Sequence, residues 1–109
     1  MIKLKYVYNK LVRDKIPENI NSKDGKKCSY KILSDDEYLK ELDKKLVEEA
    51  SEFLEGHSVE ELGDLAEVIL SIMKHKNISF EQVNEARRIK KEKNGGFENK
   101  VYLIDVEES

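Results

Sequence analysis

Hydrophobic positions recur at three- and four-residue steps through the middle of this chain, which is the spacing of amphipathic helices. One apolar stripe runs from about Asp35 to Glu55, a second from about Val59 to Lys76 and a third from about Phe80 to Lys93. The inward positions are Leu39, Leu42, Leu46, Ala50 and Phe53 in the first, Leu62, Leu65, Ala66, Ile69 and Met73 in the second, and Phe80, Val83, Ala86 and Ile89 in the third. The pattern predicts an all-α fold of three helices that each bury one face.

Each predicted helix begins at a serine that is followed three residues later by Glu or Gln, the pattern of a capping box. The pairs are Ser34 with Glu37, Ser58 with Glu61, and Ser79 with Gln82. Only Gly56-His57-Ser58 separates the first two helices, and Asn94-Gly95-Gly96 ends the third. The short break predicts that the first two helices form an antiparallel hairpin.

Minor short strands are predicted outside the helices, where apolar and polar residues alternate. The segments are Ile2 to Tyr8, Cys28 to Leu33 and Val101 to Ile104. Pro17 favours the start of a short additional helix. These elements would add a small sheet to a helical body.

Length and composition narrow the class of protein. A chain of 109 residues is long enough for a single domain, residues 1–109, with a small core that a second copy would complete. The single cysteine, Cys28, excludes an intrachain disulfide framework and fits a reducing compartment. The lysines among the first five residues do not suit a signal peptide, and the apolar run from Leu65 to Met73 is too short to cross a bilayer. A cytoplasmic protein without membrane contact is expected.

Four acidic residues carry the candidate chemistry. Glu49 and Glu52 are three residues apart on the first helix, and Glu61 and Asp64 are three apart on the second, so each pair shares a face beside its apolar stripe. Both pairs lie at matching heights from the hairpin turn, because each residue adds about 1.5 Å along a helix. Converging carboxylates repel one another unless a cation lies among them. Oxygen ligands favour Mg²⁺ or Mn²⁺, and Ca²⁺ is also compatible.

A surface role for the same acids is the competing interpretation. Glu61 is also the acid of a capping box, and Glu49 and Glu52 would be ordinary solvated side chains. Basic residues on both sides of the acidic region would bind phosphate oxygens in the first interpretation. They are Lys10, Arg13 and Lys15 before it, and Arg87, Lys90, Lys91 and Lys93 after it.

The acidic pattern resembles a known family signature. Glu48-Glu49-x-x-Glu52 followed by Glu61-x-x-Asp64 is similar to the EExxE…ExxD motif of the MazG-like all-α nucleoside triphosphate pyrophosphohydrolases, which include phosphoribosyl-ATP pyrophosphohydrolase. The segment from Asn9 to Pro17 resembles the opening of small stand-alone members. The segment from Arg87 to Phe97 resembles their closing part, and the likeness covers most of the chain.

The resemblance implies a helical bundle that is completed by dimerisation or tetramerisation. It implies Mg²⁺-dependent cleavage between the α and β phosphates of a nucleoside triphosphate, with house-cleaning of non-standard nucleotides as one role. By position, Glu49, Glu52, Glu61 and Asp64 would be the metal ligands. Glu48 would support these ligands or orient the attacking water, and Glu49 would also take part in catalysis.

Three rival functions remain open. Hydrolysis of phosphoribosyl-ATP would use the same acidic cluster. A non-enzymatic helical interaction module would use the apolar stripes instead. Nucleic-acid binding through residues 87–93 is disfavoured by the net charge of -3 and by the lack of interleaved aromatic residues.

Overall fold

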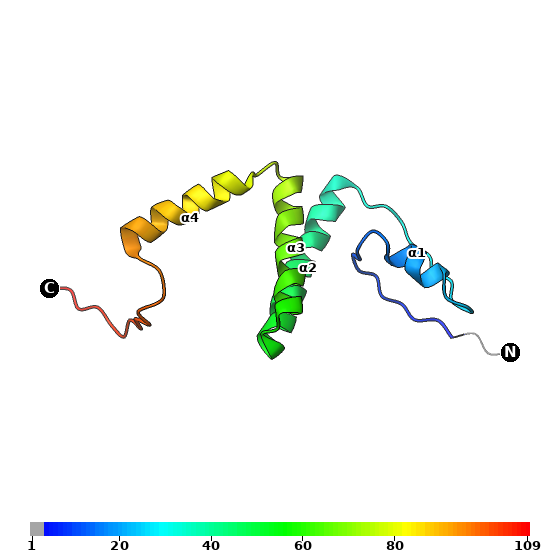
Figure 1. Ribbon diagram of the computed structural model, residues 1–109, viewed down its shortest axis with the longest axis horizontal. Helices are drawn as coiled ribbons and strands as arrows, with labels where there is room; N and C mark the ends of the chain where they lie inside the picture. Colours follow the sequence, from blue (N-terminus) through cyan, green and yellow to red (C-terminus); the bar gives the residue numbers. More distant parts are fainter. Residues whose placement is uncertain (1–3) are drawn as a thin grey trace. The chain divides into compact units, whose positions relative to one another are not determined.

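The computed structural model describes residues 4–109, and all regular secondary structure in that range is helical. The helices are α1 (Ile16–Asn21), α2 (Asp35–Gly56), α3 (Val59–His75) and α4 (Phe80–Asn94) (Figure 1). The all-α prediction is confirmed, and α2, α3 and α4 begin at the predicted residues. The chain divides into two compact units, Met1–Lys76 and Asn77–Ser109, which are described one at a time.

Serine caps fix the starts of the three long helices. The Ser34 and Ser79 capping boxes are complete, because each serine hydroxyl accepts from the N–H three residues on and the Glu37 or Gln82 side chain accepts from the serine N–H. Ser58 makes only half of this arrangement, in which its hydroxyl accepts from the Glu61 N–H at 3.1 Å. The Glu61 carboxylate is therefore not used in the cap.

Helices α2 and α3 lie side by side as the predicted antiparallel hairpin (Figure 1). The left-handed backbone of His57, with φ 52°, ends α2 and turns the chain. The Tyr38 ring at the start of α2 meets the His75 ring at the end of α3 edge-on, with 5.1 Å between the ring centroids. Leu42 of α2 and Val68 of α3, 3% and 8% exposed, are the buried apolar side chains among residues 4–109.

The packed face of α3 differs from the predicted one. Leu62 and Ile69, from the predicted stripe, are 50% and 43% exposed, and Ala66 is exposed as well. Leu65 and Met73, from the predicted stripe, are partly buried. The other positions of α3 that lose solvent contact are Glu61, Asp64, Val68, Ser71, Ile72 and His75. Helix α3 is apolar on more than one side, so spacing alone does not select the face that meets α2. The acids thus belong to the packed face.

In the second unit, α4 has an amphipathic sequence but buries no residue. The predicted inward side chains Phe80, Val83 and Ile89 are 66%, 41% and 54% exposed, so this part of the burial prediction is wrong. Helix α4 ends at Asn94, as predicted, and Gly95 follows with φ 81°, a conformation that glycine adopts without steric cost. An irregular segment completes the unit.

The predicted short strands do not form in the described part of the chain. Ile2 and Lys3, from the first of these segments, lie outside the described residues. The other positions have no neighbouring strand with which to exchange backbone hydrogen bonds, and a lone strand has no stability of its own. Left-handed backbone at Asn9 (φ 47°) and Lys100 (φ 60°) also bends the chain next to the first and third segments. Within residues 4–109, no helix has the length and apolar character needed to cross a membrane.

Candidate functional site

Two of the four predicted metal ligands carry a buried oxygen with no hydrogen-bond partner among the described residues. The atoms are Oε2 of Glu49 on α2 and Oε2 of Glu61 on α3. Glu49 is only 9% exposed although it is a carboxylate. A buried carboxylate oxygen without a partner is costly, so these two positions need either a proton or a cation.

The turn of the hairpin makes room for Glu61. Gly56 is the last residue of α2, and a Cβ atom at this position would lie 3.3 Å from Glu61 Oε2. The glycine lets the carboxylate lie directly against the end of α2. Because the Ser58 cap does not use this carboxylate, both of its oxygens remain available to a ligand.

The surroundings of Glu49 raise the pKa of its carboxyl group. Burial raises the pKa of Glu49, and the nearby carboxylates of Glu52 and Asp64 raise it further against the opposing effect of Lys45. Acids from both helices therefore raise the pKa of one buried carboxylate.

Neighbouring lysines shift the pKa of Glu48 in the opposite direction. Burial acts to raise the pKa of Glu48, but Lys45 and Lys10 outweigh it and lower the pKa. The Lys45 Nζ atom lies 3.3 Å from Glu48 and 3.8 Å from Glu49, and Lys10 Nζ lies 3.5 Å from Glu48. The contacts of Lys45 are not among the sequence predictions, although residues three and four apart on a helix commonly form ion pairs. Glu48 remains ionised beside the more strained Glu49.

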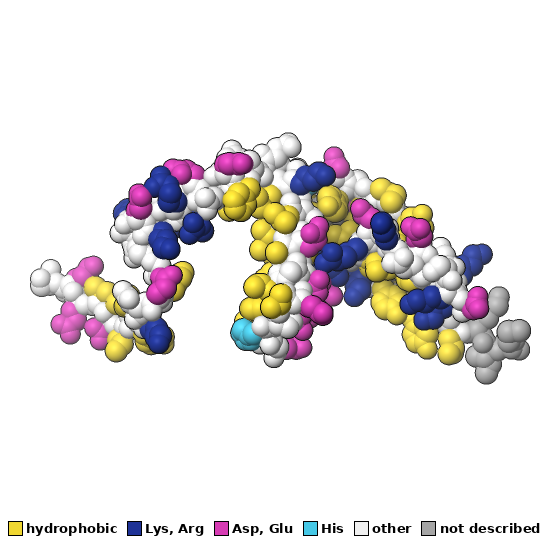
Figure 2. Space-filling view, in the orientation of Figure 1, with side chains coloured by type: hydrophobic (Ala, Val, Ile, Leu, Met, Phe, Trp, Pro, Cys, Tyr) yellow, Lys and Arg dark blue, Asp and Glu magenta, His cyan; other side chains and the backbone are white. Residues whose placement is uncertain are grey.

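The segment before α1 supplies positive charge to the hairpin. Arg13 Nη2 donates to Asp64 Oδ1 at 2.9 Å, across 51 residues of sequence. Lys10 reaches Glu48 on the other helix, so two of the three basic residues predicted in this segment contact the acidic cluster. Lys15 precedes α1 and makes no ion pair with the described residues. Figure 2 shows acidic side chains along one side of the hairpin and hydrophobic side chains along the other.

The donor set suits a hard divalent cation, since it consists of carboxylate oxygens and includes two that are buried and unsatisfied. Glu52 is exposed, and Asp64 is paired with Arg13. In residues 4–109 there is no group of three or more acidic, histidine or cysteine side chains arranged to hold a metal ion. The donors are of the chemical type that the predicted metal prefers, but they do not converge on one metal position in residues 4–109. Glu49 is paired with Lys45 and Asp64 with Arg13, whereas Glu52 and Glu61 form no ion pair with the described residues.

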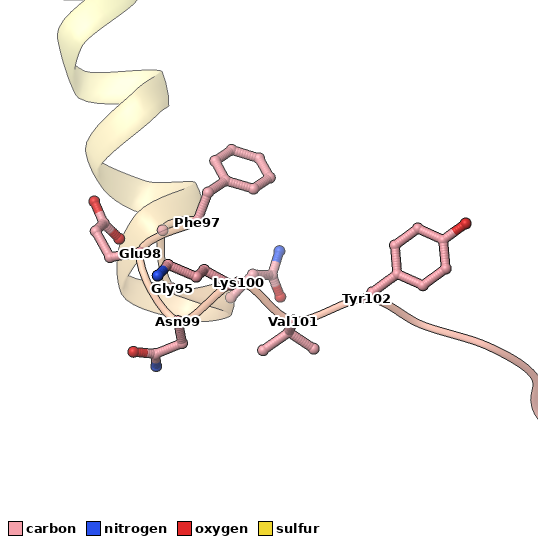
Figure 3. A pocket seen from close by; sticks show the side chains of 9 residues that line it. Gly95, Phe97, Glu98, Asn99, Lys100, Val101 and Tyr102 are labelled. Atoms are coloured by element: carbon pink, nitrogen blue, oxygen red, sulfur yellow. The ribbon is translucent and has the colours of Figure 1, made fainter.

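The basic residues predicted after the acidic region belong to the second unit. Arg87, Lys90 and Lys91 line an open groove of about 780 Å³ at the end of α4, whereas Lys93 does not line it. The Gly95-Gly96 turn and Phe97 form the rest of its wall together with Asn94 and Glu98. Figure 3 shows a second pocket beside the same turn, lined by the segment from Asn94 to Tyr102, with the Phe97 ring near the turn and the Tyr102 ring further along the chain.

Comparison of the chain with protein-family models, characterised proteins and solved structures finds no match.

Proposed function

We propose that this chain is a divalent-metal-dependent nucleoside triphosphate pyrophosphohydrolase of the MazG-like type. The observation that supports the proposal most strongly is the pair of buried, unpartnered carboxylate oxygens on Glu49 and Glu61. They come from adjacent helices, and the resemblance to the EExxE…ExxD motif names the same two residues. A surface role would leave such oxygens in water.

The residues have distinct roles in this proposal. Glu49, Glu52, Glu61 and Asp64 would hold Mg²⁺, or Mn²⁺ in its place. When bound, the ion would supply charge to the phosphate oxygens and lower the pKa of a water molecule. Glu48 is kept ionised by Lys45 and Lys10, which suits a carboxylate that orients the attacking water and accepts its proton.

Basic side chains would hold the triphosphate. Lys10 and Arg13 already lie at the acidic cluster, where they form ion pairs with Glu48 and Asp64. If these ion pairs break, the N–H groups of both side chains become available to phosphate oxygens. Lys15 is a weaker candidate, because it forms no ion pair with the described part of the hairpin. The α4 residues Arg87, Lys90, Lys91 and Lys93 complete the predicted set.

A second copy of the chain is part of the proposal. The side of α3 that faces away from α2 carries Leu62 and Ile69, half-exposed, with Ala66 between them. Val47 and Leu54 on α2 are 66% and 67% exposed. Covering these side chains would add to a hairpin core that otherwise contains Leu42 and Val68. A homodimer, or a tetramer built from it, would provide that cover.

Pyrophosphate release over a panel of nucleotides, with and without Mg²⁺, tests the activity. The panel includes common and damaged nucleoside triphosphates and phosphoribosyl-ATP, so it also separates the two candidate substrates. We expect Glu52→Gln and Asp64→Asn to abolish release while circular dichroism shows an intact helical fold. Glu60→Gln, an exposed acid on the same helix as Asp64, is the matched control and should retain activity.

A helical interaction module is the alternative, and the exposed apolar side chains of α3 favour it. The two proposals differ in their response to Mg²⁺. An enzyme of this type gains thermal stability when the metal neutralises Glu49 and Glu61, whereas an interaction module does not. Absence of both pyrophosphate release and a Mg²⁺-dependent rise in melting temperature would leave the interaction module as the better account.

A further inference from the structure

The basic residues of α4 differ in whether they already have a partner. Arg88 is fully engaged, since it donates to Glu85 at 2.7 Å and to Glu92 at 2.6 Å. Arg87, Lys90 and Lys91 form no ion pair with any residue in the described range 4–109. These three are the ones that line the groove at the end of α4. Figure 2 shows basic side chains over this helix.

Helix geometry gathers the three charges. Positions 87, 90 and 91 are separated by three and four residues and therefore share a face, which spans about 6 Å along the axis. Asn84 accepts from both Nε and Nη2 of Arg87, at 3.2 and 3.1 Å, which orients the guanidinium. Three positive side chains that share one short surface and form no ion pair with the described residues repel one another, so an external anion would stabilise them.

Apart from Glu98, the other wall of the groove is neutral or aromatic. Gly95 and Gly96 present backbone without side chains, and Phe97, 97% exposed, stands beside them (Figure 3). A largely exposed phenylalanine next to clustered cations suits a ligand with phosphates at one end and a flat ring at the other. The groove volume of about 780 Å³ lies in the usual range for small-molecule sites.

Two features act against an anion here. Glu98 also lines the groove, with its carboxylate folded against Gly96. The carbonyl end of α4 carries partial negative charge, and Lys91 lies in that last turn. Arg87 and Lys90 precede the last turn, so the helix dipole does not account for them. With three cations against one carboxylate, the balance favours anion binding.

We infer that the end of α4 is a metal-independent nucleotide-binding site, in which Arg87, Lys90 and Lys91 hold phosphate groups and Phe97 stacks on the base. The choice of a nucleotide among phosphate-bearing ligands rests on the proposed function, whereas anion binding itself rests on the groove alone. This site extends the phosphate-binding role already proposed for these three residues. It adds binding in the absence of metal and a stacking role for Phe97, in a unit that contains none of the acidic cluster.

Isothermal titration of the full chain with ATP and with inorganic triphosphate, both in EDTA, tests this site. We expect both ligands to bind, with affinity that falls as salt is raised. The triple variant Arg87→Gln, Lys90→Gln, Lys91→Gln should weaken binding roughly thirtyfold, at about threefold for each charge. Arg88→Gln is the matched control and should change the dissociation constant less than about twofold, because that charge is already neutralised.

Two further variants separate the two halves of the ligand. Phe97→Leu should weaken ATP by about fivefold and leave triphosphate unchanged, since only ATP has a ring to stack. Glu98→Gln should tighten both ligands about twofold, because it removes the opposing charge. Circular dichroism of each variant confirms that α4 is retained.

Several results would overturn the site. They are no binding by the unaltered protein, equal weakening by Arg88→Gln, or displacement of ATP by a single-stranded oligonucleotide at far lower concentration, which would indicate a nucleic-acid surface. The proposed hydrolase activity is judged separately by pyrophosphate release with Mg²⁺. Metal-free binding can therefore fail while hydrolysis is observed, and the reverse.

Discussion

The α2–α3 hairpin and α4 are built from similar sequence patterns but bury very different amounts of surface. Each long helix has a serine cap and apolar residues at helical spacing. In the hairpin, Leu42, Val68 and even Glu49 lose almost all contact with solvent, whereas no residue of α4 is buried. An apolar stripe indicates which side of a helix can pack, but the stripe is buried only where another element covers it.

The same contrast holds for charge. In the hairpin, burial and neighbouring acids raise the pKa of Glu49, and no described side chain satisfies one of its oxygens. On α4, Glu85 is exposed, and its hydrogen bond with Arg88 lowers its pKa. Unsatisfied acidic charge therefore collects in the packed unit and unsatisfied basic charge in the exposed one.

The largest expected effect is on core packing. Leu42→Ala should lower the free energy of unfolding by about 3 kcal/mol, because it opens a cavity between α2 and α3. Ile89→Ala on α4 should cost less than about 0.5 kcal/mol, as for other exposed positions. Urea denaturation measures both. Equal losses would mean that the α4 stripe is covered in solution, and the contrast between the units would disappear.

The second largest expected effect is on self-association through the side of α3 that faces away from α2. Ile69→Asp should weaken self-association by about 2 kcal/mol, roughly thirtyfold in dissociation constant, if a second copy covers this side chain. Sedimentation over a dilution series measures the change. Lys74→Asp, at an exposed position of the same helix, controls for added negative charge and should leave the assembly in place. A monomeric unaltered protein would contradict the predicted oligomer directly.

Replacing a buried and an exposed glutamate by glutamine should change the free energy of unfolding by a smaller amount. Glu49→Gln should raise the free energy of unfolding at pH 7 without metal by about 1 kcal/mol, because it removes an incompletely compensated buried charge. Glu85→Gln should leave stability unchanged within error. Thermal melts in EDTA measure both variants.

The pH dependence of stability tests independently whether the Glu49 carboxylate stabilises or destabilises the folded protein. Since the folded-state pKa of Glu49 is raised, the folded protein binds more protons than the unfolded one between its ordinary value of 4.5 and the raised value. Stability should therefore fall as the pH rises through that window, and Glu49→Gln should flatten the fall. A decrease in stability at pH 7 on this substitution would mean that Glu49 has a favourable partner instead.

The smallest expected change concerns Arg13. Its pair with Asp64 is largely exposed, so Arg13→Gln should alter stability by less than about 0.5 kcal/mol. Mg²⁺ binding, followed by titration without nucleotide, should tighten roughly threefold because a competing cation is removed. Lys15→Gln, in the same segment but without an ion pair to the described residues, should leave the affinity unchanged. Equal effects would indicate a general change in charge.

Helix bounds were predictable because serine caps and glycine stops are local signals. Ser34, Ser58 and Ser79 each precede a helix as expected, and Asn94 ends the last one. The hairpin also followed from sequence, since only two residues separate α2 from α3. Strand pairing depends on neighbours that the local pattern does not reveal, and for this reason the segment after Lys100 was predicted wrongly.

The candidate site was predictable in its acidic residues but not in its internal cations. Three-residue spacing identified Glu49 with Glu52, and Glu61 with Asp64. The contact of Arg13 with Asp64 joins positions 51 residues apart, and no local pattern reports a contact of that range. The partnerless oxygen of Glu61 depends on a half-formed cap, which a serine-acid pair in sequence cannot distinguish from a complete one.

The close approach of Gly56 to the Glu61 carboxylate makes these two positions sterically dependent on each other. The Cβ of an alanine in place of this glycine would lie 3.3 Å from Glu61 Oε2, so the end of the glutamate would have to move by a few tenths of an ångström. The shorter aspartate at position 61 would remove the crowding, and we expect the two substitutions to be tolerated better together than the alanine alone.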